Sequence, residues 1–226
     1  MAQQMKCRIK GCSNPVISFS DKCGGHTSSK KIIAALKQFK GKKFNKLYLH
    51  ELDISKVKFQ KKLFYNSKFG EISFEDMTFE TCLFELLHCF NSTFNSCSFT
   101  SCTFSECDFQ DVTFSNCTFT DCEFKSSSFI EGAFHDDTVI TNTSFIKGLF
   151  IGFFIYDTKA FNNIKVIETK FNQASINRAN FKNCSWKKCE FTKTTWYDSA
   201  INDSKWIDIV HDFDITGSPK LCDFTN

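Results

Sequence analysis

Residues 92–136 decide the fold, because they read STFNS CSFTS CTFSE CDFQD VTFSN CTFTD CEFKS SSFIE GAFHD in units of five. A bulky residue, usually Phe, stands at the centre of each unit. Such centres run unbroken from Phe44 to Val139, then in a shifted register through residues 145–155, and again from Phe161 to Trp206. Of the 29 Phe in this chain of 226 residues, 22 occupy these centres. The period of five therefore explains most of an unusual composition.

A period of five fits neither a helix nor an uninterrupted strand. Five residues advance an α-helix by about 140°, which would place Phe on every side. In a strand, an odd period would send successive Phe to opposite faces. The residue two before the centre is also small or apolar in many units, and residues two apart share one face of an extended segment. Each unit therefore points one large and one small residue inward and then turns, so that the chain coils around its own core.

This pattern resembles the pentapeptide-repeat proteins, whose consensus is a small residue, a polar residue, Leu or Phe, and two variable residues. The resemblance implies an all-β fold, a right-handed quadrilateral β-helix with four pentads per coil, over residues 42–208. About eight coils at the β spacing would make a rod about 35–40 Å long. We expect residues 1–27 to form a metal module, 28–41 a capping helix, and 209–226 a C-terminal cap or tail.

Thirteen cysteines and no secretory signal indicate a reducing compartment, and we expect a cytoplasmic protein. Eight of the cysteines occupy the small inward position, where three of them, Cys82, Cys102 and Cys122, should stack at intervals of 20. They read either as a metal or redox ladder or as small apolar residues beneath Phe, and we favour the second interpretation. The eight are Cys82, Cys97, Cys102, Cys107, Cys117, Cys122, Cys184 and Cys189.

The early cysteines do not follow the pentad and predict a structural zinc site. Cys7, Cys12, Cys23 and His26 lie within CRIKGCSNPVISFSDKCGGHT, with the spacing C-x4-C-x10-C-x2-H. Thiolate and imidazole are ligands that tetrahedral Zn²⁺ selects, and four protein ligands leave no open catalytic position. The motif also resembles short Cys3His zinc modules at the N-termini of bacterial and phage proteins. The alternative is three surface cysteines and a loop histidine.

A lysine-rich segment follows, SSKKIIAALKQFKGKKF, with an apolar stripe on a predicted helix. We favour an end cap, because the first coil of a solenoid exposes core and unpaired backbone that must be covered. The alternative is direct nucleic-acid binding by the basic module, for which the candidates are Lys30, Lys31, Lys42 and Lys43.

Charge is unevenly placed although the formal net charge is only +3. Residues 1–65 carry 15 Lys and Arg against 3 acids, whereas residues 66–140 carry 2 against 13. The middle coils are therefore an acidic surface that attracts a basic, DNA-handling protein. The alternative is a solvated surface that keeps the rod soluble. The acidic candidates are Glu71, Glu75, Asp76, Glu80, Glu85, Glu106, Asp108, Asp111, Asp121 and Glu123.

The resemblance also makes DNA mimicry available, since some pentapeptide-repeat proteins mimic DNA and bind type II topoisomerases. Those contacts reside in shape, charge and projecting loops rather than in a motif, so no residue is carried over here. A topoisomerase is accordingly one possible partner, inferred from the family and not from any spacing.

The segment TSFIKGLFIGFFIYD places apolar residues where the pentad expects outward polar ones, and single extra residues break the register near Ile140 and Ala160. We interpret this patch as a partner or homodimer surface, or as the contact of a bacterial effector or scaffold. The alternative is that the register slip tucks these residues under a bulged loop. The patch consists of Ile146, Leu149, Ile151, Phe154 and Tyr156.

Catalytic motifs are missing from the sequence: no P-loop, dinucleotide fingerprint, HExxH or nucleophile elbow occurs. No run of about 18 apolar residues predicts a membrane span. We therefore expect a non-enzymatic macromolecular binding protein without a small-molecule substrate or membrane partner. Its first candidate partner is a protein bound by the acidic coils, and its second is nucleic acid bound by the basic module.

Overall fold

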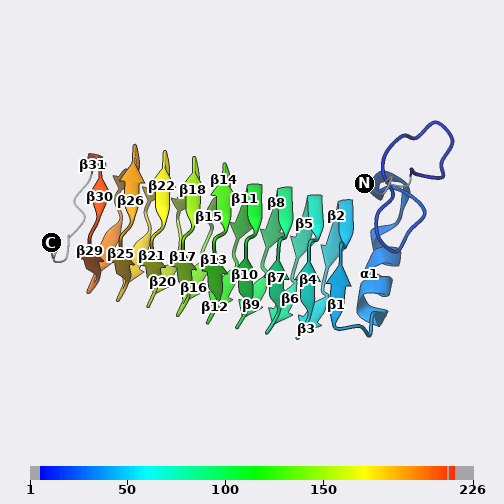
Figure 1. Ribbon diagram of the computed structural model, residues 1–226, viewed down its shortest axis with the longest axis horizontal. Coiled ribbons are helices and arrows are strands. Elements are labelled where there is room, and N and C mark those ends of the chain that lie inside the picture. The colour runs from blue at the N-terminus through cyan, green and yellow to red at the C-terminus, as the bar shows by residue number, and fades with distance from the viewer. Residues whose placement is uncertain (1–5, 213, 217–226) are drawn as a thin grey trace.

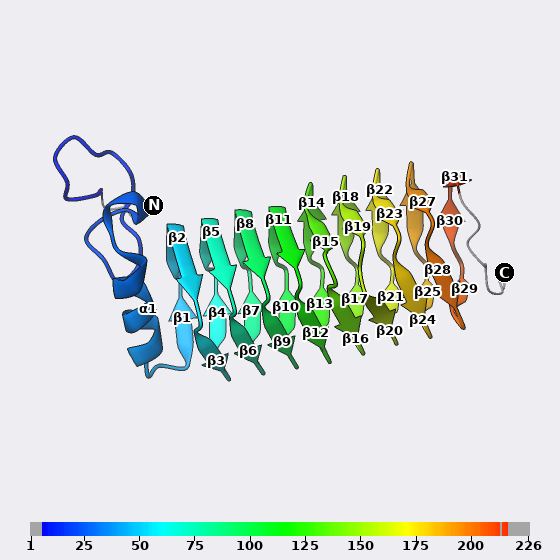
Figure 2. The same cartoon turned by 180° about the vertical axis from the view of Figure 1, so that it is seen from behind.

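The computed structural model describes residues 6–212 and 214–216. The chain winds into a four-sided parallel β-solenoid, a rod with helix α1 (Ser29–Gln38) at one end and strand β31 (Asp214–Thr216) at the other (Figure 1). The view from behind shows the same stacking of coils (Figure 2). Eight complete coils run from Phe44 to Ile201, so the predicted quadrilateral β-helix is confirmed.

We number the four sides of the rod in chain order. Face 1 is a sheet of nine strands: β1 (Lys43–Asn45), β4 (Leu63–Tyr65), β7 (Leu83–Glu85), β10 (Thr103–Ser105), β13 (Glu123–Lys125), β17 (Ser144–Ile146), β21 (Lys165–Ile167), β25 (Ser185–Lys187) and β29 (Lys205–Ile207). Face 4 is a sheet of eight: β3 (Lys58–Gln60), β6 (Thr78–Glu80), β9 (Ser98–Thr100), β12 (Thr118–Thr120), β16 (Val139–Thr141), β20 (Ala160–Asn162), β24 (Asn180–Lys182) and β28 (Ala200–Asn202).

Faces 2 and 3 form one sheet of 14 strands, because four long strands run across the corner between them. These are β2 (Tyr48–Ser55), β5 (Lys68–Glu75), β8 (His88–Asn95) and β11 (Asp108–Ser115). The other strands of face 2 are β14 (Ser128–Ile130), β18 (Leu149–Ile151), β22 (Lys170–Asn172), β26 (Glu190–Thr192) and β30 (Val210–His211). Those of face 3 are β15 (Ala133–His135), β19 (Phe154–Tyr156), β23 (Ser175–Asn177), β27 (Thr195–Tyr197) and β31 (Asp214–Thr216).

Stacked phenylalanines fill the interior. The register pairs Phe84 with Phe104 and Phe104 with Phe124, one coil apart. Their ring centroids lie 4.6 and 4.4 Å apart, with the ring planes within 5° of parallel. Rings on adjacent faces meet edge to face, as Phe99 and Phe104 do at 5.7 Å. Each such pair adds about 0.5–1.5 kcal/mol beyond its buried area.

The small inward position is occupied by residues that also satisfy a backbone carbonyl. The Cys102 thiol donates to the carbonyl of Phe79 at 3.4 Å and to that of Thr100 at 3.5 Å. The Ser127 hydroxyl donates to Phe104 and Lys125 in the same way. The eight cysteines predicted at this position are all buried. A thiol there acts as a small apolar residue with a weak donor.

Nearly all corners turn through the left-handed backbone region at a residue other than glycine, and Gly152 is an exception. Glu106, at the corner between faces 1 and 2, has φ of 52°, and its amide donates to the carbonyl of Lys125 in the next coil at 2.9 Å. A non-glycine residue in this region costs about 1 kcal/mol or more, which the continuous ladder of hydrogen bonds offsets. This explains how a chain with so many turns contains only 9 Gly.

Two coils have 21 residues instead of 20, because Phe124 pairs with Phe145 and Phe145 with Val166. In the first of them Asp136 and Asp137 both take positive φ, so the extra residue lies before β16. Ile140, fully buried, is the inward centre of that strand, and Val139 is only half-buried. The prediction of Val139 as a centre was therefore wrong by one residue.

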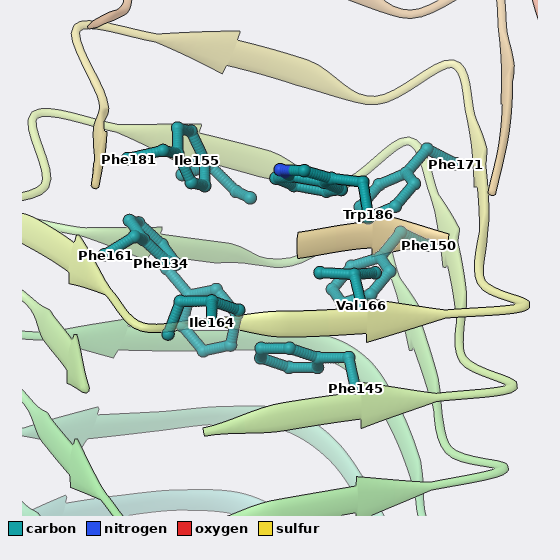
Figure 3. Close-up of a pocket in the computed structure, with 10 residues that line it drawn as sticks. All are labelled: Phe134, Phe145, Phe150, Ile155, Phe161, Ile164, Val166, Phe171, Phe181 and Trp186. Atoms are coloured by element: carbon teal, nitrogen blue, oxygen red, sulfur yellow. The ribbon is translucent and has the colours of Figure 1, made fainter. Parts of the chain in front are cut away.

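A small cavity of about 20 Å³ lies in the interior, in the part of the rod where Ile and Val replace Phe at some centres (Figure 3). Its lining is entirely apolar and includes Ile155, Ile164 and Val166. A space of this size holds one water at most and offers it no polar partner.

Among the described residues, no helix is long and apolar enough to cross a membrane. Strand pairing continues to Thr216, beyond the predicted end of the repeat at residue 208. Most of the predicted cap or tail at 209–226 lies outside the described residues.

Candidate functional site

The four predicted zinc ligands meet in one cluster at the N-terminal end. Cys7 and Cys12 lie in an irregular loop, while Cys23 immediately precedes a single helical turn, η1 (Gly24–His26), and His26 is its last residue. The Cys12 and Cys23 sulfurs are 3.8 Å apart, and His26 Nδ1 lies 3.2 Å from Cys23 Sγ and 3.5 Å from Cys7 Sγ. All four ligand atoms lie within 4.8 Å of one another.

These distances fit a tetrahedral ion. With Zn–S bonds of about 2.3 Å and Zn–N bonds of about 2.0 Å, the edges of the tetrahedron are about 3.5–3.8 Å. The sulfur–sulfur and sulfur–nitrogen separations of the cluster fall close to that range. The four side chains therefore lie close enough together to hold one metal ion.

The thiols of the cluster have different acidities. Burial raises the pKa of the Cys7 thiol, but hydrogen bonds from the backbone at Cys23 and Ile9 and from the His26 side chain outweigh it and bring that pKa to about 6. Burial, followed by the neighbouring Cys12 and Cys7, raises the pKa of Cys23. A negative sulfur at one position disfavours a second one beside it. Cys7 is thus the thiolate that forms first.

Alkylation of the metal-free protein tests this order. At pH 7.5 we expect iodoacetamide to modify Cys7 at least five times faster than Cys23, measured by mass spectrometry of timed digests. Solenoid cysteines such as Cys89 and Cys107 should stay unmodified until denaturant is added, because burial raises the pKa of each thiol to about 12. Modification of Cys23 before Cys7 would contradict the assignment.

The metal module covers the open end of the first coil. Ser18 N donates to the Tyr48 carbonyl at 2.8 Å, and the Ser18 hydroxyl accepts from Tyr48 N at 2.9 Å. The Ser29 hydroxyl, at the start of α1, accepts from Asp53 N at 3.1 Å. These bonds satisfy edge groups of β2 that have no preceding coil to pair with. A Cβ on Gly24 would lie 1.7 Å from the His50 carbonyl oxygen, so the module fits β2 only with glycine there.

A second group of potential ligands, His50, Glu51 and Glu71, lies beside this contact. Glu51 approaches His50 Nδ1 at 3.5 Å, whereas Glu71 approaches Nε2 at 3.3 Å. Because the carboxylates face opposite ring nitrogens, the group is an ion-pair network and not a chelate. Glu51 also accepts from Gly25 N at 2.9 Å and so ties the module to the rod. Sequence reasoning missed this network, whose members only the stacking of coils brings together.

The predicted acidic residues lie on every side of the rod. Over the second to fifth coils, however, face 3 and its two corners (residues 71–76, 91–96, 111–116 and 131–137) carry seven acids and neither Lys nor Arg. All seven are exposed: Glu71, Glu75, Asp76, Asp111, Glu131, Asp136 and Asp137. The other six predicted acids lie on faces 1, 2 and 4 or their corners: Glu80, Glu85, Glu106, Asp108, Asp121 and Glu123.

Face 3 is also where the acids are least neutralised. Glu80 pairs with Lys58 at 3.0 Å, Glu123 with Lys125 at 2.7 Å, and Asp108 with His88 at 3.0 Å, all away from face 3. On face 3, Glu71 faces His50 and Asp136 faces His135. Within the described part of the chain, the other five acids there form no ion pair: Glu75, Asp76, Asp111, Glu131 and Asp137.

The predicted apolar patch lies on the outside of the sixth coil, in strands and not under a loop. Phe154 is 50% exposed, and the other four members are half-buried. Ile146 is on face 1, Leu149 and Ile151 are on face 2, and Phe154 and Tyr156 are on face 3. Tyr156 stacks on His135 of the preceding coil, with ring centroids 5.1 Å apart. The patch is therefore a band around three sides of the rod.

The four lysines considered for nucleic-acid binding, Lys30, Lys31, Lys42 and Lys43, are all exposed at the N-terminal end. Lys43 lies over the Tyr65 ring, 4.1 Å from its centroid.

The chain resembles known proteins in part of its sequence and in its fold. A family model described as the SV2A/B/C luminal domain matches residues 35–124. No curated protein matches. Among solved structures, the chain is similar to HetL, a pentapeptide repeat protein involved in heterocyst differentiation regulation from the cyanobacterium Nostoc sp. strain PCC 7120 (8% identity, 82% of this chain and 95% of that one, TM-score 0.37).

Two further solved structures are similar. QnrB1, a plasmid-mediated fluoroquinolone resistance protein, shares 14% identity over 69% of this chain and 94% of that one, with a TM-score of 0.38. Rfr23, a pentapeptide repeat protein from the cyanobacterium Cyanothece 51142, shares 10% over 55% and 91%, with a TM-score of 0.29.

The repeat and the geometry of the coils define the type of β-helix. Each coil has four pentads, whose large central residue and, in most of them, the residue two before it are buried, and successive coils pair in parallel. The chain is a pentapeptide-repeat β-helix. Side chains fill the interior of the rod apart from the small cavity, so contacts with other molecules fall to its outside.

Proposed function

We propose that this pentapeptide-repeat protein is a non-enzymatic binding protein whose acidic surface docks a basic, DNA-handling protein partner. The observation that carries the proposal is the group of seven acids on face 3, five of them without an ion pair among the described residues and none with a neighbouring Lys or Arg on that face. Such a field accelerates encounter with a basic surface and repels nucleic acid. In the same proposal, Cys7, Cys12, Cys23 and His26 hold a structural zinc ion at the N-terminal end of the rod. We also propose that the protein acts in the cytoplasm, because none of the twelve described cysteines forms a disulfide.

A competition assay tests the acidic face. Wild type should displace duplex DNA from a purified type II topoisomerase at ~0.15 M salt, where exposed charges more than about 8 Å apart are largely screened from each other. The variant Glu71→Gln, Glu75→Gln, Asp76→Asn, Asp111→Asn should need at least ten times more protein. A matched variant of the C-terminal coils, Glu168→Gln, Asp198→Asn, Asp203→Asn, Asp208→Asn, should compete like wild type.

Direct nucleic-acid binding is the competing function, supported by the four exposed lysines at the N-terminal end. It predicts a gel shift of DNA by this protein alone, which weakens steeply with salt and is lost when Lys30, Lys31, Lys42 and Lys43 become Gln. That result, without competition for the topoisomerase, would replace the acidic-docking proposal.

A further inference from the structure

The acidic run and the apolar band, which are separate in the sequence, are continuous on face 3. The acids occupy the second to fifth coils, and Phe154 and Tyr156 follow on the same face in the sixth. The acidic run ends there, because the Arg178 guanidinium of the next coil binds both oxygens of Asp157. One side of the rod therefore presents acids from the second to the fifth of its eight coils, the third coil excepted, and an exposed aromatic side chain in the sixth.

The corner residue beside Phe154 is a glycine, so this corner carries no side chain; we call it the bare corner. Gly152, with φ of +56°, turns the chain from face 2 to face 3 between Ile151 and Phe154. The same corner in the other coils carries a side chain at a similar φ, between 46° and 54°. Those residues are Glu51, Glu71, Asn91, Asp111, Glu131, Gln173 and Lys193.

Neither the backbone nor packing requires this glycine. Seven other residue positions show that a side chain is accommodated at this turn, and a Cβ on Gly152 would meet only Glu131 Cγ, at an ordinary 3.6 Å. What the glycine does is remove the side chain that would separate Ile151 from Phe154. The apolar surface thereby continues around the corner from face 2 onto face 3.

We propose that face 3 is the docking site for a basic amphipathic helix of a partner protein. Its apolar residues would contact Ile151, Phe154 and Tyr156 across the bare corner, and its Lys or Arg residues would lie along the acids from Glu131 back to Glu71. The second to sixth coils span about 19 Å, which about 13 residues of α-helix cover. An aromatic anchor next to a complementary charged surface is a common arrangement at protein interfaces. The inference rests on the proposed function and names its partner's chemistry.

A second copy of this chain does not supply that helix. Its own basic helix, α1, already buries its apolar stripe against the first coil, where Ile32 and Leu36 are nearly inaccessible. Nucleic acid is disfavoured at the same face, because five unpaired carboxylates would repel its phosphates.

A model peptide tests the inference. A fluorescein-labelled 18-residue peptide with Leu on one helical face and Lys on the other is titrated with the full-length, metal-loaded protein, and binding is followed by anisotropy. Wild type should bind in the micromolar range. Phe154→Ser and Gly152→Gln should each weaken binding at least tenfold, the second because it restores a corner side chain of the kind Gln173 already provides.

Matched variants separate docking from general damage. Tyr197→Ser removes an aromatic side chain that is 52% exposed on the same face two coils away, and Asn91→Gln changes the same corner three coils earlier. Both should bind the peptide like wild type. Circular dichroism should show the same strand content in all variants.

Several outcomes would overturn the inference. They are no binding to wild type, equal binding of a Leu and Glu peptide, or unchanged binding by Phe154→Ser and Gly152→Gln. If those two variants bind normally while the face 3 acid variant does not, acidic docking survives and only the apolar anchor fails. A dimer in sedimentation velocity that Phe154→Ser dissociates would make a second copy the occupant instead.

Discussion

Cys23→Ser should abolish metal binding and release the N-terminal module from the rod. Purified wild type should contain about one zinc per chain by elemental analysis, and the variant less than a tenth of that. Structural zinc contributes apparent binding energies of about 10–16 kcal/mol in small modules, and residues 6–27 have little core of their own to replace it. The bonds from Ser18 to Tyr48 and from Gly25 to Glu51 should open with the module.

Hydrogen exchange locates that effect. Amides of β2 should lose at least tenfold protection in Cys23→Ser, whereas strands from the third coil onward should keep theirs, because each coil contacts only its neighbours. Cys97→Ser is the matched control: its thiol lies in the solenoid at a position where serine is common, and it should retain the metal. Metal-free wild type with normal β2 protection would show that the module folds without an ion.

The interior of the fold could be predicted from the sequence because its period encodes position. The pentad places a large and a small residue inward in every unit, and the stacked rings and buried cysteines follow from it. The prediction failed at Val139, where an added aspartate in the preceding turn shifts Ile140 inward. Two adjacent aspartates, both at positive φ, absorb the extra residue at a corner without breaking the sheet. The pentad alone does not say on which side of a strand an insertion falls.

Phe153 shows a second limit of the period. It is a large residue at the inward position where the pentad predicts a small one. Its side chain is buried, and its ring packs against Phe129, Phe134 and Phe150. Gly132, one coil earlier, leaves room beside it: a Cβ there would lie 2.2 Å from the Val112 carbonyl oxygen and 3.0 Å from the Phe153 ring. The pair Gly132 and Phe153 is one coil apart in space but 21 residues apart in sequence, so the compensation becomes visible only once the coils are aligned.

The candidate sites were predictable to different degrees. The spacing of Cys7, Cys12, Cys23 and His26 predicted them as metal ligands, because few other sets of residues combine three thiols and an imidazole over so short a segment. For the acids, composition predicted an acidic middle but not a side. Which acids share face 3 depends on the coil length. Which acids of the rod are paired depends on neighbours in space, such as Lys58 beside Glu80 and His88 beside Asp108, both away from face 3.

Phe119→Ala should cost about 3–5 kcal/mol of unfolding free energy, measured by urea denaturation. Its side chain is fully buried, stacks on Phe99 at 4.6 Å with planes 2° apart, and meets Phe114 edge to face at 5.4 Å. Its coil lies in the middle of the rod, so the cavity weakens the interfaces on both sides and cannot be relieved by fraying from an end.

The control for this prediction is Phe154→Ala, which removes the same side chain from a position that is 50% exposed. Surface changes of this kind usually alter stability by no more than about 0.5 kcal/mol. Equal losses from Phe119 and Phe154 would mean that the outer phenylalanine is as much a part of the core as the inner one. A large loss at Phe119 with almost none at Phe154 would separate the two roles of phenylalanine in this chain, one filling the rod and one left outside for a partner.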